Sequence, residues 1–153
     1  MRVLGIDCGS EATGYGVVES DGRQHRAIEA GTVRVRRRPE DGLAVRLHFI
    51  HTRLCELMAL HQPDCVAIED IFFAKYPQAA LMLGHARGVA LLAAAEVGLL
   101  VSAYPPSVVK RSIGGSGRAD KSQVAQLVGA VLGLTSLPAE DATDALAIAL
   151  TPL

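Results

Sequence analysis

The sequence predicts an α/β fold: a mixed five-stranded sheet, formed by three antiparallel strands and then a βαβαβ unit, with helices on both faces. Two observations lead to this prediction. The first 35 residues hold three strand-like runs separated by turn residues. The apolar spacing then becomes helical, and two short apolar runs alternate with helical stretches further along the chain. Right-handed crossovers constrain how these later strands join the sheet.

The three N-terminal strands are predicted at residues 2–7, 13–19 and 26–35. The first is almost continuously apolar, which is typical of a strand that is buried on both faces. Gly9 and Gly14 bracket a sharp loop after it, and Ser20-Asp21-Gly22 supplies a turn suited to a tight hairpin. These features indicate an antiparallel meander.

Helices and two further strands are predicted in the rest of the chain. Leu43, Leu47, Ile50 and Leu54 recur at helical spacing, so a helix is expected over residues 39–61, with Pro39 in its first turn. The remaining elements are strands at 65–69 and 99–104, a helix at 77–97, a short helix at 107–112, a loop at 114–118, and helices at 121–132 and 139–150.

Length and composition exclude several classes of protein. The 153 residues, half of them apolar, are enough for one folded domain, and no linker divides residues 1–153. No apolar stretch reaches the roughly 20 residues that span a bilayer, and no signal peptide is visible. We therefore expect a cytoplasmic protein without membrane contact.

The cysteines and two helical histidines give no indication of a disulfide framework or a metal site. The three cysteines are scattered, and Cys55 and Cys65 are predicted to be small buried apolar residues. His48 and His51 lie three residues apart on the first helix, but no third ligand is evident. We expect both histidines to be partly exposed helix residues.

Positive charge is concentrated in one part of a nearly neutral chain. The formal net charge is −1, but the basic residues between positions 71 and 121 are accompanied by only Glu96 and Asp120. A local basic surface suits a polyanionic partner such as nucleic acid. The basic residues of this segment are Lys75, Arg87, Lys110, Arg111, Arg118 and Lys121.

Acidic residues end two of the predicted strands. Asp7 ends the first and Glu69 ends the fourth, and the order of elements allows these strands to be parallel neighbours. Their carboxylates would then lie at adjacent places on one edge of the sheet. Asp141 and Asp144, three residues apart, share one face of the last helix and can point toward the same place.

Four carboxylates in one cleft repel one another unless a cation offsets their charge. Two unit charges ~4 Å apart repel by about 4 kcal/mol at an effective dielectric constant near 20. Oxygen ligands favour Mg²⁺ or Mn²⁺, and two such ions activate water and stabilise the leaving oxygen in phosphodiester cleavage. The pattern predicts a two-metal nuclease. Unrelated surface charges remain the alternative, above all for Asp141 and Asp144.

An aromatic pair and a basic loop are further candidates. Phe72 and Phe73 follow the fourth strand, and one exposed Phe would stack on bases, although both could be core residues. Lys110, Arg118 and Lys121 flank a Gly-rich loop that could follow a DNA backbone. Lys121 is also a candidate to stabilise charge at the scissile phosphate. Solvated surface residues are the alternative, chiefly for Arg118.

Five separated motifs resemble one known family. They are, in order, GIDCGSEATGYGVV, AIEDIFFAK, LGHARGVALLAAAE, VKRSIGGSGRADKSQV and DATDALAIAL. Together, over essentially the whole chain, they resemble the bacterial RuvC-type Holliday-junction resolvases. One departure is Cys8, at a position where that family usually carries Pro.

The resemblance implies an RNase H-like fold and a homodimeric endonuclease that cuts four-way DNA junctions symmetrically with Mg²⁺ or Mn²⁺, in recombination and DNA repair. It implies metal binding by the four acids, DNA handling and catalysis by Lys110 and Lys121, base contacts by Phe72, and work beside the RuvA–RuvB branch-migration complex. With the charge pattern, the expected DNA-binding residues are Phe72, Phe73, Lys75, Arg87, Lys110, Arg118 and Lys121.

Other interpretations stay open from the residues alone. A related RNase H-like nuclease could act on RNA or other branched DNA, and a non-catalytic junction-binding module would not need all four acids. An actin-like sugar kinase or ATPase half also begins with a strand, an acid and a Gly/Thr loop, but needs a second lobe for which this chain is too short. The Ala-rich helix at 77–97, with Gly84 and Gly88, suits either burial within the monomer or a two-fold dimer contact.

Overall fold

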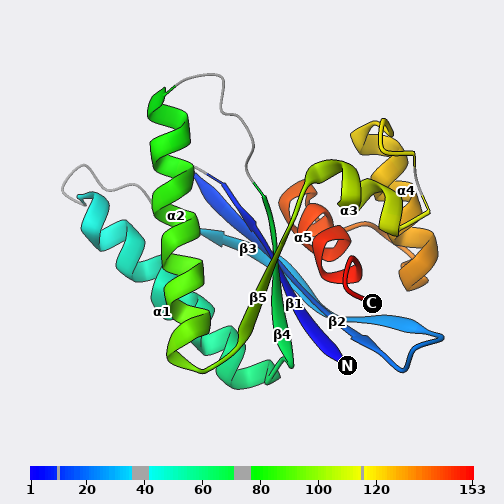
Figure 1. Cartoon of the computed structure of the whole chain (residues 1–153), viewed down its shortest axis with the longest axis horizontal. Coiled ribbons are helices and arrows are strands. Elements are labelled where there is room, and N and C mark those ends of the chain that lie inside the picture. Colours follow the sequence, from blue (N-terminus) through cyan, green and yellow to red (C-terminus); the bar gives the residue numbers. More distant parts are fainter. Residues whose placement is uncertain (10, 36–41, 71–76, 115) are drawn as a thin grey trace.

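The structure, a computed structural model, describes residues 1–9, 11–35, 42–70, 77–114 and 116–153 (Figure 1). Its mixed five-stranded sheet has the strand order β3-β2-β1-β4-β5. β1, β2 and β3 pair antiparallel, β4 runs parallel to β1, and β5 runs parallel to β4, which confirms the predicted fold class. The strands are β1 Arg2–Cys8, β2 Ala12–Ser20, β3 His25–Arg34, β4 Cys65–Glu69 and β5 Leu100–Tyr104.

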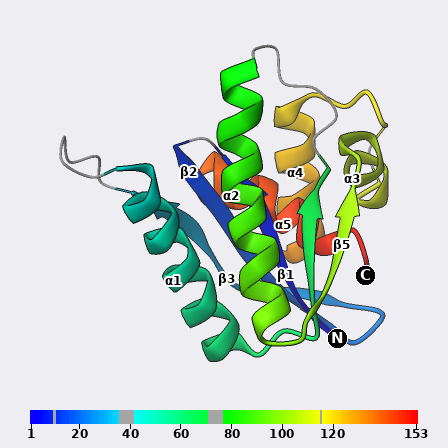
Figure 2. The same ribbon diagram turned by 60° about the vertical axis from the view of Figure 1, so that its left-hand side comes forward.

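Helices cover both faces of the sheet, as predicted. α1 and α2 lie on one face, and α3, α4 and α5 lie on the other (Figure 1, Figure 2). Each face has its own apolar core. The helices are α1 Leu43–His61, α2 Pro77–Glu96, α3 Pro106–Ser112, α4 Lys121–Leu132 and α5 Glu140–Leu150.

Side chains along β1 and β4 alternate between the two cores. Leu4 and Ile6 join the core under α1 and α2, whereas Val3 joins the core that includes α4 and α5. On β4, Val66 and Ala67 divide between the cores in the same way. A strand buried on both faces needs apolar residues at every position, which explains the unbroken apolar runs of the sequence.

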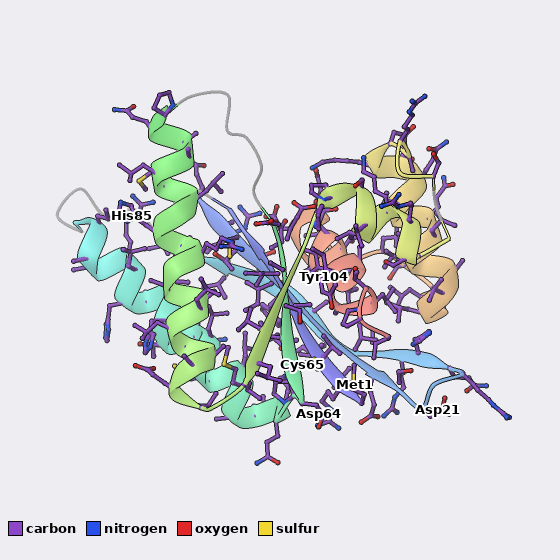
Figure 3. All side chains as sticks on the ribbon, in the orientation of Figure 1. Met1, Asp21, Asp64, Cys65, His85 and Tyr104 are labelled. Atoms are coloured by element: carbon purple, nitrogen blue, oxygen red, sulfur yellow. The ribbon has the colours of Figure 1, made fainter. Side chains whose placement is uncertain are left out.

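β1 and β4 begin at the same level of the sheet. The backbone N–H of Asp64 donates to the carbonyl of Arg2 at 2.8 Å, and the backbone N–H of Arg2 donates to Asp64 Oδ2 at 2.6 Å. Met1, Asp64 and Cys65 accordingly lie at one end of the sheet (Figure 3).

The same register brings the other ends of the two strands together. Ile6 of β1 pairs with Ile68 of β4, and the next residues along the two parallel strands are Asp7 and Glu69. This confirms the prediction that the first and fourth strands are parallel neighbours. Two acids far apart in the sequence therefore reach one edge of the sheet.

α5 approaches β1 and β2 closely because these strands present glycines to it. A Cβ at Gly5 would clash with the α5 backbone, and a Cβ at Gly14 would clash with the carbonyl of Asp141. Only a residue without a side chain fits at such positions. The N-terminal part of α5, with Asp141 in its first turn and Asp144 in the next, therefore lies against the strand ends.

Two local expectations differ from the structure. α1 begins at Leu43, with Gly42 as its N-cap, and residues 39–41, which were expected to open it, lie outside the described residues. The turn between β2 and β3 is longer than a tight hairpin. Asp21 Oδ1 accepts hydrogen bonds from the backbone N–H groups of Arg23 and Gln24, each at 2.8 Å, which stabilises the wider turn.

The sequence holds no unbroken apolar stretch of about 20 residues, but one helix of the structure is long and apolar enough to span a membrane. Among the described residues this helix is α2, whose 20 residues pass by length and composition alone. The expectation of no membrane contact was based on unbroken apolar runs. The hydropathy averaged along α2 stays high although His85 and Arg87 interrupt its apolar residues. Its Ala86 and Ala90 are buried, while Leu81 is 61% exposed. α2 therefore carries apolar side chains on its outer side as well.

Candidate active site

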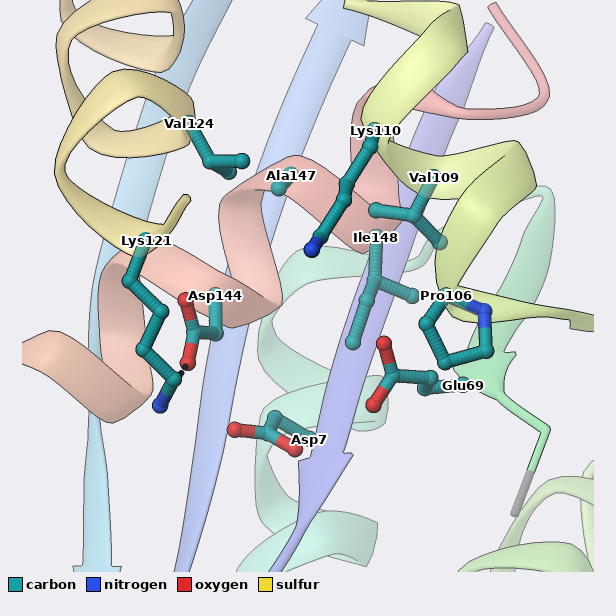
Figure 4. A pocket seen from close by; sticks show the side chains of 10 residues that line it. All are labelled: Asp7, Glu69, Pro106, Val109, Lys110, Lys121, Val124, Asp144, Ala147 and Ile148. Carbon is teal, nitrogen blue, oxygen red and sulfur yellow. Dashed lines mark ion pairs between the residues drawn. The ribbon is translucent and has the colours of Figure 1, made fainter. Parts of the chain in front are cut away.

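A pocket of about 330 Å³ opens where the ends of β1 and β4 meet α3, α4 and α5 (Figure 4). Carboxylates and ammonium groups from five different elements converge on it, above an apolar floor contributed by α3, α4 and α5. The lining residues are Asp7, Glu69, Pro106, Val109, Lys110, Lys121, Val124, Asp144, Ala147 and Ile148.

Asp7 experiences the charge of all the other predicted acids. The pKa of its carboxyl is raised from 3.8 to about 7, first by burial and then by the charges of Asp144, Glu69 and Asp141, while the charge of Lys121 opposes them. A charged carboxylate is poorly solvated in such a place and is repelled by its neighbours. Asp7 therefore favours a bound proton or a nearby cation.

Glu69 and Asp144 have raised pKa values for the same reasons. Burial is the main cause at Glu69, the charge of Asp144 adds to it, and Lys110 and Lys121 lower it. At Asp144 burial again raises the pKa most, and the charge of Lys121 is the main opposing effect. The two lysines thus offset part, but not all, of the cost of collecting these acids.

The start of α4 holds Lys121 at the pocket. Asp120 Oδ1 accepts from the backbone N–H of Gln123 at 2.9 Å, and Gln123 Oε1 accepts from the backbone N–H of Asp120 at 3.0 Å. This capping box sets Lys121 at the first turn of the helix. Lys121 Nζ pairs with Glu140 and lies 3.6 Å from Asp144 Oδ2. The bond to Glu140 is the main reason that the pKa of Lys121 is raised.

Lys110 and Arg87 reach the strand ends from opposite faces of the sheet. Lys110 extends from α3 into the pocket (Figure 4). Arg87 of α2 instead pairs with Asp70, with Nη2 3.3 Å from Oδ1. The pKa of the Cys8 thiol is raised to about 12, first by burial and then by the charge of Asp7, while the charge of Arg87 opposes them. Arg87 thus lies beside the strand ends, outside the pocket lining.

Asp141 and Arg118 are not among the pocket-lining residues. Asp141 lies in the first turn of α5, near enough for its charge to raise the pKa of Asp7 and Asp144. Arg118 is exposed in the segment before α4, where its backbone N–H donates to Ser116 Oγ at 3.2 Å.

Three of the predicted DNA contacts fall on a part of the chain that the structure does not describe. Phe72, Phe73 and Lys75 lie within residues 71–76, outside the described residues.

Sequence reasoning missed two acids beside this site. Glu140 pairs with Lys121, and Asp70 pairs with Arg87. Glu140 stands four residues before Asp144, a spacing that puts both on one helix face, so its position was a usable signal. Asp70 directly follows Glu69, but a charge just beyond a strand end carries no comparable signal.

The donor set suits a hard divalent cation. Asp7, Glu69 and Asp144 offer only carboxylate oxygens, which Mg²⁺ and Mn²⁺ prefer. Burial raises the pKa of each of these acids, so a cation among them would supply the charge that their surroundings lack. The residues present therefore fit such an ion.

Comparisons with known proteins agree on one family. The family model "Crossover junction endodeoxyribonuclease RuvC" matches residues 3–152. The RuvC protein of Halorhodospira halophila is 52% identical over 149 residues, which cover 97% of this chain and 87% of that protein. The Koribacter versatilis RuvC protein is 49% identical over 155 residues, covering 100% of this chain and 92% of its own length.

Solved structures extend the match to three dimensions. The Thermus thermophilus RuvC structure has a TM-score of 0.88 and 39% identity, covering 99% of this chain and 92% of that one. A structure of T. thermophilus RuvC in complex with a Holliday junction substrate has the same TM-score, with 36% identity and the same coverage. The RNase H-like fold implied by the resemblance is confirmed. The chain belongs to the RuvC family of crossover junction endodeoxyribonucleases.

Proposed function

We propose that this protein is a metal-dependent endonuclease that resolves four-way DNA junctions by paired symmetric nicks. The observation that carries the proposal is the convergence of Asp7, Glu69 and Asp144, with Lys110 and Lys121, on one open pocket. A relative that is 36% identical was solved in complex with a Holliday junction substrate, which supports the same substrate here.

The metal ligands of the proposal are Asp7, Glu69, Asp141 and Asp144, which would hold two Mg²⁺ or Mn²⁺ ions. Such ions, when bound, activate water and stabilise the leaving oxygen of a phosphodiester. Three of the acids line the pocket, and the charge of Asp141 reaches Asp7 from the same helix as Asp144. The all-oxygen donor set supports a hard cation over zinc.

The two pocket lysines have different proposed roles. Lys121, anchored by Glu140 and 3.6 Å from Asp144 Oδ2, orients that carboxylate and offers a fixed positive charge to a scissile phosphate. Lys110 reaches in from α3, and its charge lowers the pKa of Glu69. We assign Lys110 to phosphate contact and Lys121 to contact and catalysis.

The DNA footprint extends beyond the pocket in this proposal. Arg118 is exposed three residues before Lys121, and Arg87 flanks the strand ends. Contacts of this kind neutralise phosphates and weaken as salt increases. The aromatic segment after β4 would contribute base stacking, worth about 1–3 kcal/mol per base. The proposed contacts of that segment are Phe72, Phe73 and Lys75.

A homodimer is the proposed working form, with α2 as its contact. Leu81 and Leu92 are 61% and 53% exposed on α2. A Cβ at Gly84 or Gly88 would meet nothing within 4 Å, so burial within the monomer does not require glycine at either position. Small outward residues permit close approach of a second helix, and a two-fold contact matches a substrate that is cut symmetrically.

The dimer proposal is tested by light scattering during size-exclusion chromatography. We expect wild type to elute as a dimer and Leu81→Arg to elute as a monomer, because a charge would be buried at the contact. Leu137→Arg, at a side chain that is 46% exposed on another surface, is the matched control and should stay dimeric. A monomeric wild type, or dimeric Leu81→Arg, would contradict the assignment of α2.

A cellular setting follows from the same proposal. We propose a cytoplasmic enzyme of recombination and DNA repair that acts beside the RuvA–RuvB branch-migration complex, as the family resemblance implies. Adding purified RuvA and RuvB to the cleavage reaction should raise the rate on junctions with mobile cores and leave the rate on fixed-core junctions unchanged.

The function is tested with a labelled synthetic four-way junction and a linear duplex of the same sequence. Each is incubated with Mg²⁺, Mn²⁺ or EDTA and resolved on a denaturing gel. We expect paired nicks at symmetric positions on the junction, none on the duplex, and none in EDTA. Asp7→Asn should abolish cutting but keep junction binding in a gel-shift assay, because only one charge in the pocket is lost.

Controls separate the competing interpretations. Glu56→Gln removes an exposed carboxylate of α1 that pairs with Arg53, far from the pocket in the fold, and should cut at the wild-type rate. Binding without cleavage under every metal would favour a non-catalytic module. Cleavage of RNA hybrids or of linear DNA in preference to the junction would favour another RNase H-like nuclease.

A further inference from the structure

Three potential metal ligands meet between α1 and α2, outside the pocket. His51 and Cys55 stand one turn apart on α1, and Glu96 is the last residue of α2. His51 Nε2 lies 2.7 Å from Glu96 Oε2, Cys55 Sγ lies 3.7 Å from His51 Nε2, and Cys55 Sγ lies 4.0 Å from Glu96 Oε2. α1 and α2 run side by side over one face of the sheet (Figure 2).

The separations of these atoms match a single coordination sphere. A triangle with these three sides has a circumscribed circle of radius about 2.1 Å, and zinc bonds to nitrogen or oxygen are about 2.0–2.2 Å long. A cation slightly off the plane of the triangle also reaches the longer zinc–sulfur distance of about 2.3 Å. The ligand atoms are thus already arranged for one ion.

The chemistry of the ligands selects a different metal from that of the pocket. Thiolate and imidazole favour Zn²⁺ and related transition metals, whereas Mg²⁺ and Mn²⁺ prefer carboxylate oxygens. A His and a Cys four residues apart on a helix present their donors on the same side, as metal-binding helices require. Glu96 supplies the third ligand from the neighbouring helix.

Exposure and charge at the cluster permit an ion to enter. The side chains of His51 and Glu96 are 25% and 48% exposed, so one side of the triangle is open to water. Burial, and then the charge of Glu96, raises the pKa of the Cys55 thiol, so the thiolate is costly to form there. A cation between the two side chains would offset that cost. Entry of the ion would release the thiol proton and move the His51 ring proton to Nδ1, leaving Nε2 to bind.

We propose that His51, Cys55 and Glu96 form a Zn²⁺ site that joins α1 to the C-terminal end of α2, with water as the fourth ligand. The sequence showed no third ligand beside His48 and His51, whereas the structure brings Cys55 and Glu96 close to His51. Cys55 lies one turn further along α1, and Glu96 lies at the end of α2. The site is independent of the nuclease pocket, and its role is to brace the helical layer on that face of the sheet.

Cobalt absorption tests the proposal on the full chain. Co²⁺ is titrated in the presence of excess Mg²⁺, which occupies carboxylate sites, and a near-ultraviolet thiolate-to-cobalt charge-transfer band is monitored. We expect the band in wild type, with displacement by equimolar Zn²⁺. Carboxylates do not give this band, so ion binding in the pocket cannot imitate it. Absence of the band in wild type would overturn the proposal.

Variants identify the ligands. Cys55→Ala should abolish the band, and Glu96→Gln should keep a band but weaken Zn²⁺ affinity by at least about tenfold, the loss typical of disturbing a metal site. Cys65→Ala, at another half-buried free thiol, is the matched control and should behave as wild type. A band that survives Cys55→Ala, or disappears in Cys65→Ala, would contradict the assignment.

A stability measurement gives a second readout that does not depend on colour. Zn²⁺ should raise the melting temperature of wild type and of Cys65→Ala, and should raise that of Cys55→Ala less. Mg²⁺ should not produce this difference between wild type and Cys55→Ala. An equal Zn²⁺ shift in wild type and Cys55→Ala would overturn the proposal, because binding at these ligands would then contribute nothing to the fold.

Discussion

The carbonyl of Asp141 occupies the space in which a side chain at Gly14 would begin. This contact sets the distance between α5 and β2, and therefore how far the first turn of α5 can reach toward Asp7. The glycine-rich sequence after the first strand thus serves the site by letting a helix approach. A site assembled from several elements depends on such contacts as much as on its ligands.

Gly14→Ala should therefore separate α5 from the sheet. Overpacking of this kind costs about 1–3 kcal/mol, so we expect a lower free energy of unfolding by urea and a lower rate of junction cleavage. Gly42→Ala, at the N-cap of α1, is the matched control, since a Cβ there meets nothing within 4 Å. It should change the free energy of unfolding by less than about 1 kcal/mol and leave junction cleavage at the wild-type rate. Equal stability of Gly14→Ala and wild type would contradict this account.

Asp7 should destabilise the metal-free chain at high pH. Burial and the neighbouring acids raise its pKa from 3.8 to about 7, so between these values the folded chain keeps a proton that the unfolded chain has lost. The free energy of unfolding should fall as pH rises through this window, by on the order of 4 kcal/mol for Asp7 alone. In EDTA at pH 8, Asp7→Asn should resist urea better than wild type, and its advantage should shrink toward pH 4.

Added Mg²⁺ should stabilise the wild type more at pH 8 than at pH 5. A protonated carboxyl is a poor ligand, and Asp7 holds its proton below about pH 7. We expect a larger Mg²⁺-dependent rise in melting temperature at the higher pH, and cleavage at limiting Mg²⁺ that increases from pH 6 to pH 8. A pH-independent Mg²⁺ effect would exclude Asp7 from the metal site.

Lys121 should affect cleavage more than binding. Lys121→Met removes the charge beside Asp144, and losing one stabilising group of this kind costs on the order of 10²-fold in rate. Single-turnover cleavage and junction affinity separate the two effects. Glu140→Gln removes the partner but keeps the ammonium group, so it should cut nearly as fast as wild type. If Glu140→Gln is as slow as Lys121→Met, the ion pair rather than the lysine charge is essential.

The cap of α4 should contribute to both stability and activity. Asp120→Ala removes the capping box that precedes Lys121, at a cost of about 0.5–2 kcal/mol in unfolding free energy. Asp120→Asn keeps an accepting oxygen and should retain most of the stability. Urea unfolding and single-turnover cleavage of both variants check this expectation, and Asp120→Ala with wild-type values in both assays would refute it.

Much of the site could be predicted because strand ends are local features. Asp7 and Glu69 close apolar runs, and parallel strands that begin together also end together. The spacing of Asp141 and Asp144 likewise follows from helical geometry alone. These inferences needed only periodicity and the order of elements.

Contacts between elements distant in the sequence could not be predicted in the same way. The pairing of Lys121 with Glu140, and of His51 with Glu96, depends on how far two helices slide and turn against each other. Apolar packing decides those quantities, and packing is not encoded in any single segment. The close approach of α5 at Gly14 became visible only when the helix and the strand were both in position.

The sequence by itself determined the element types, the parallel pairing of β1 with β4, and which acids stand at strand ends, because each follows from local periodicity and chain order. Tertiary structure alone decided which acids line one pocket, which lysines offset part of their charge, and that His51, Cys55 and Glu96 meet. The physical reason is that side-chain distances across elements are set by the packing of two apolar cores against one sheet.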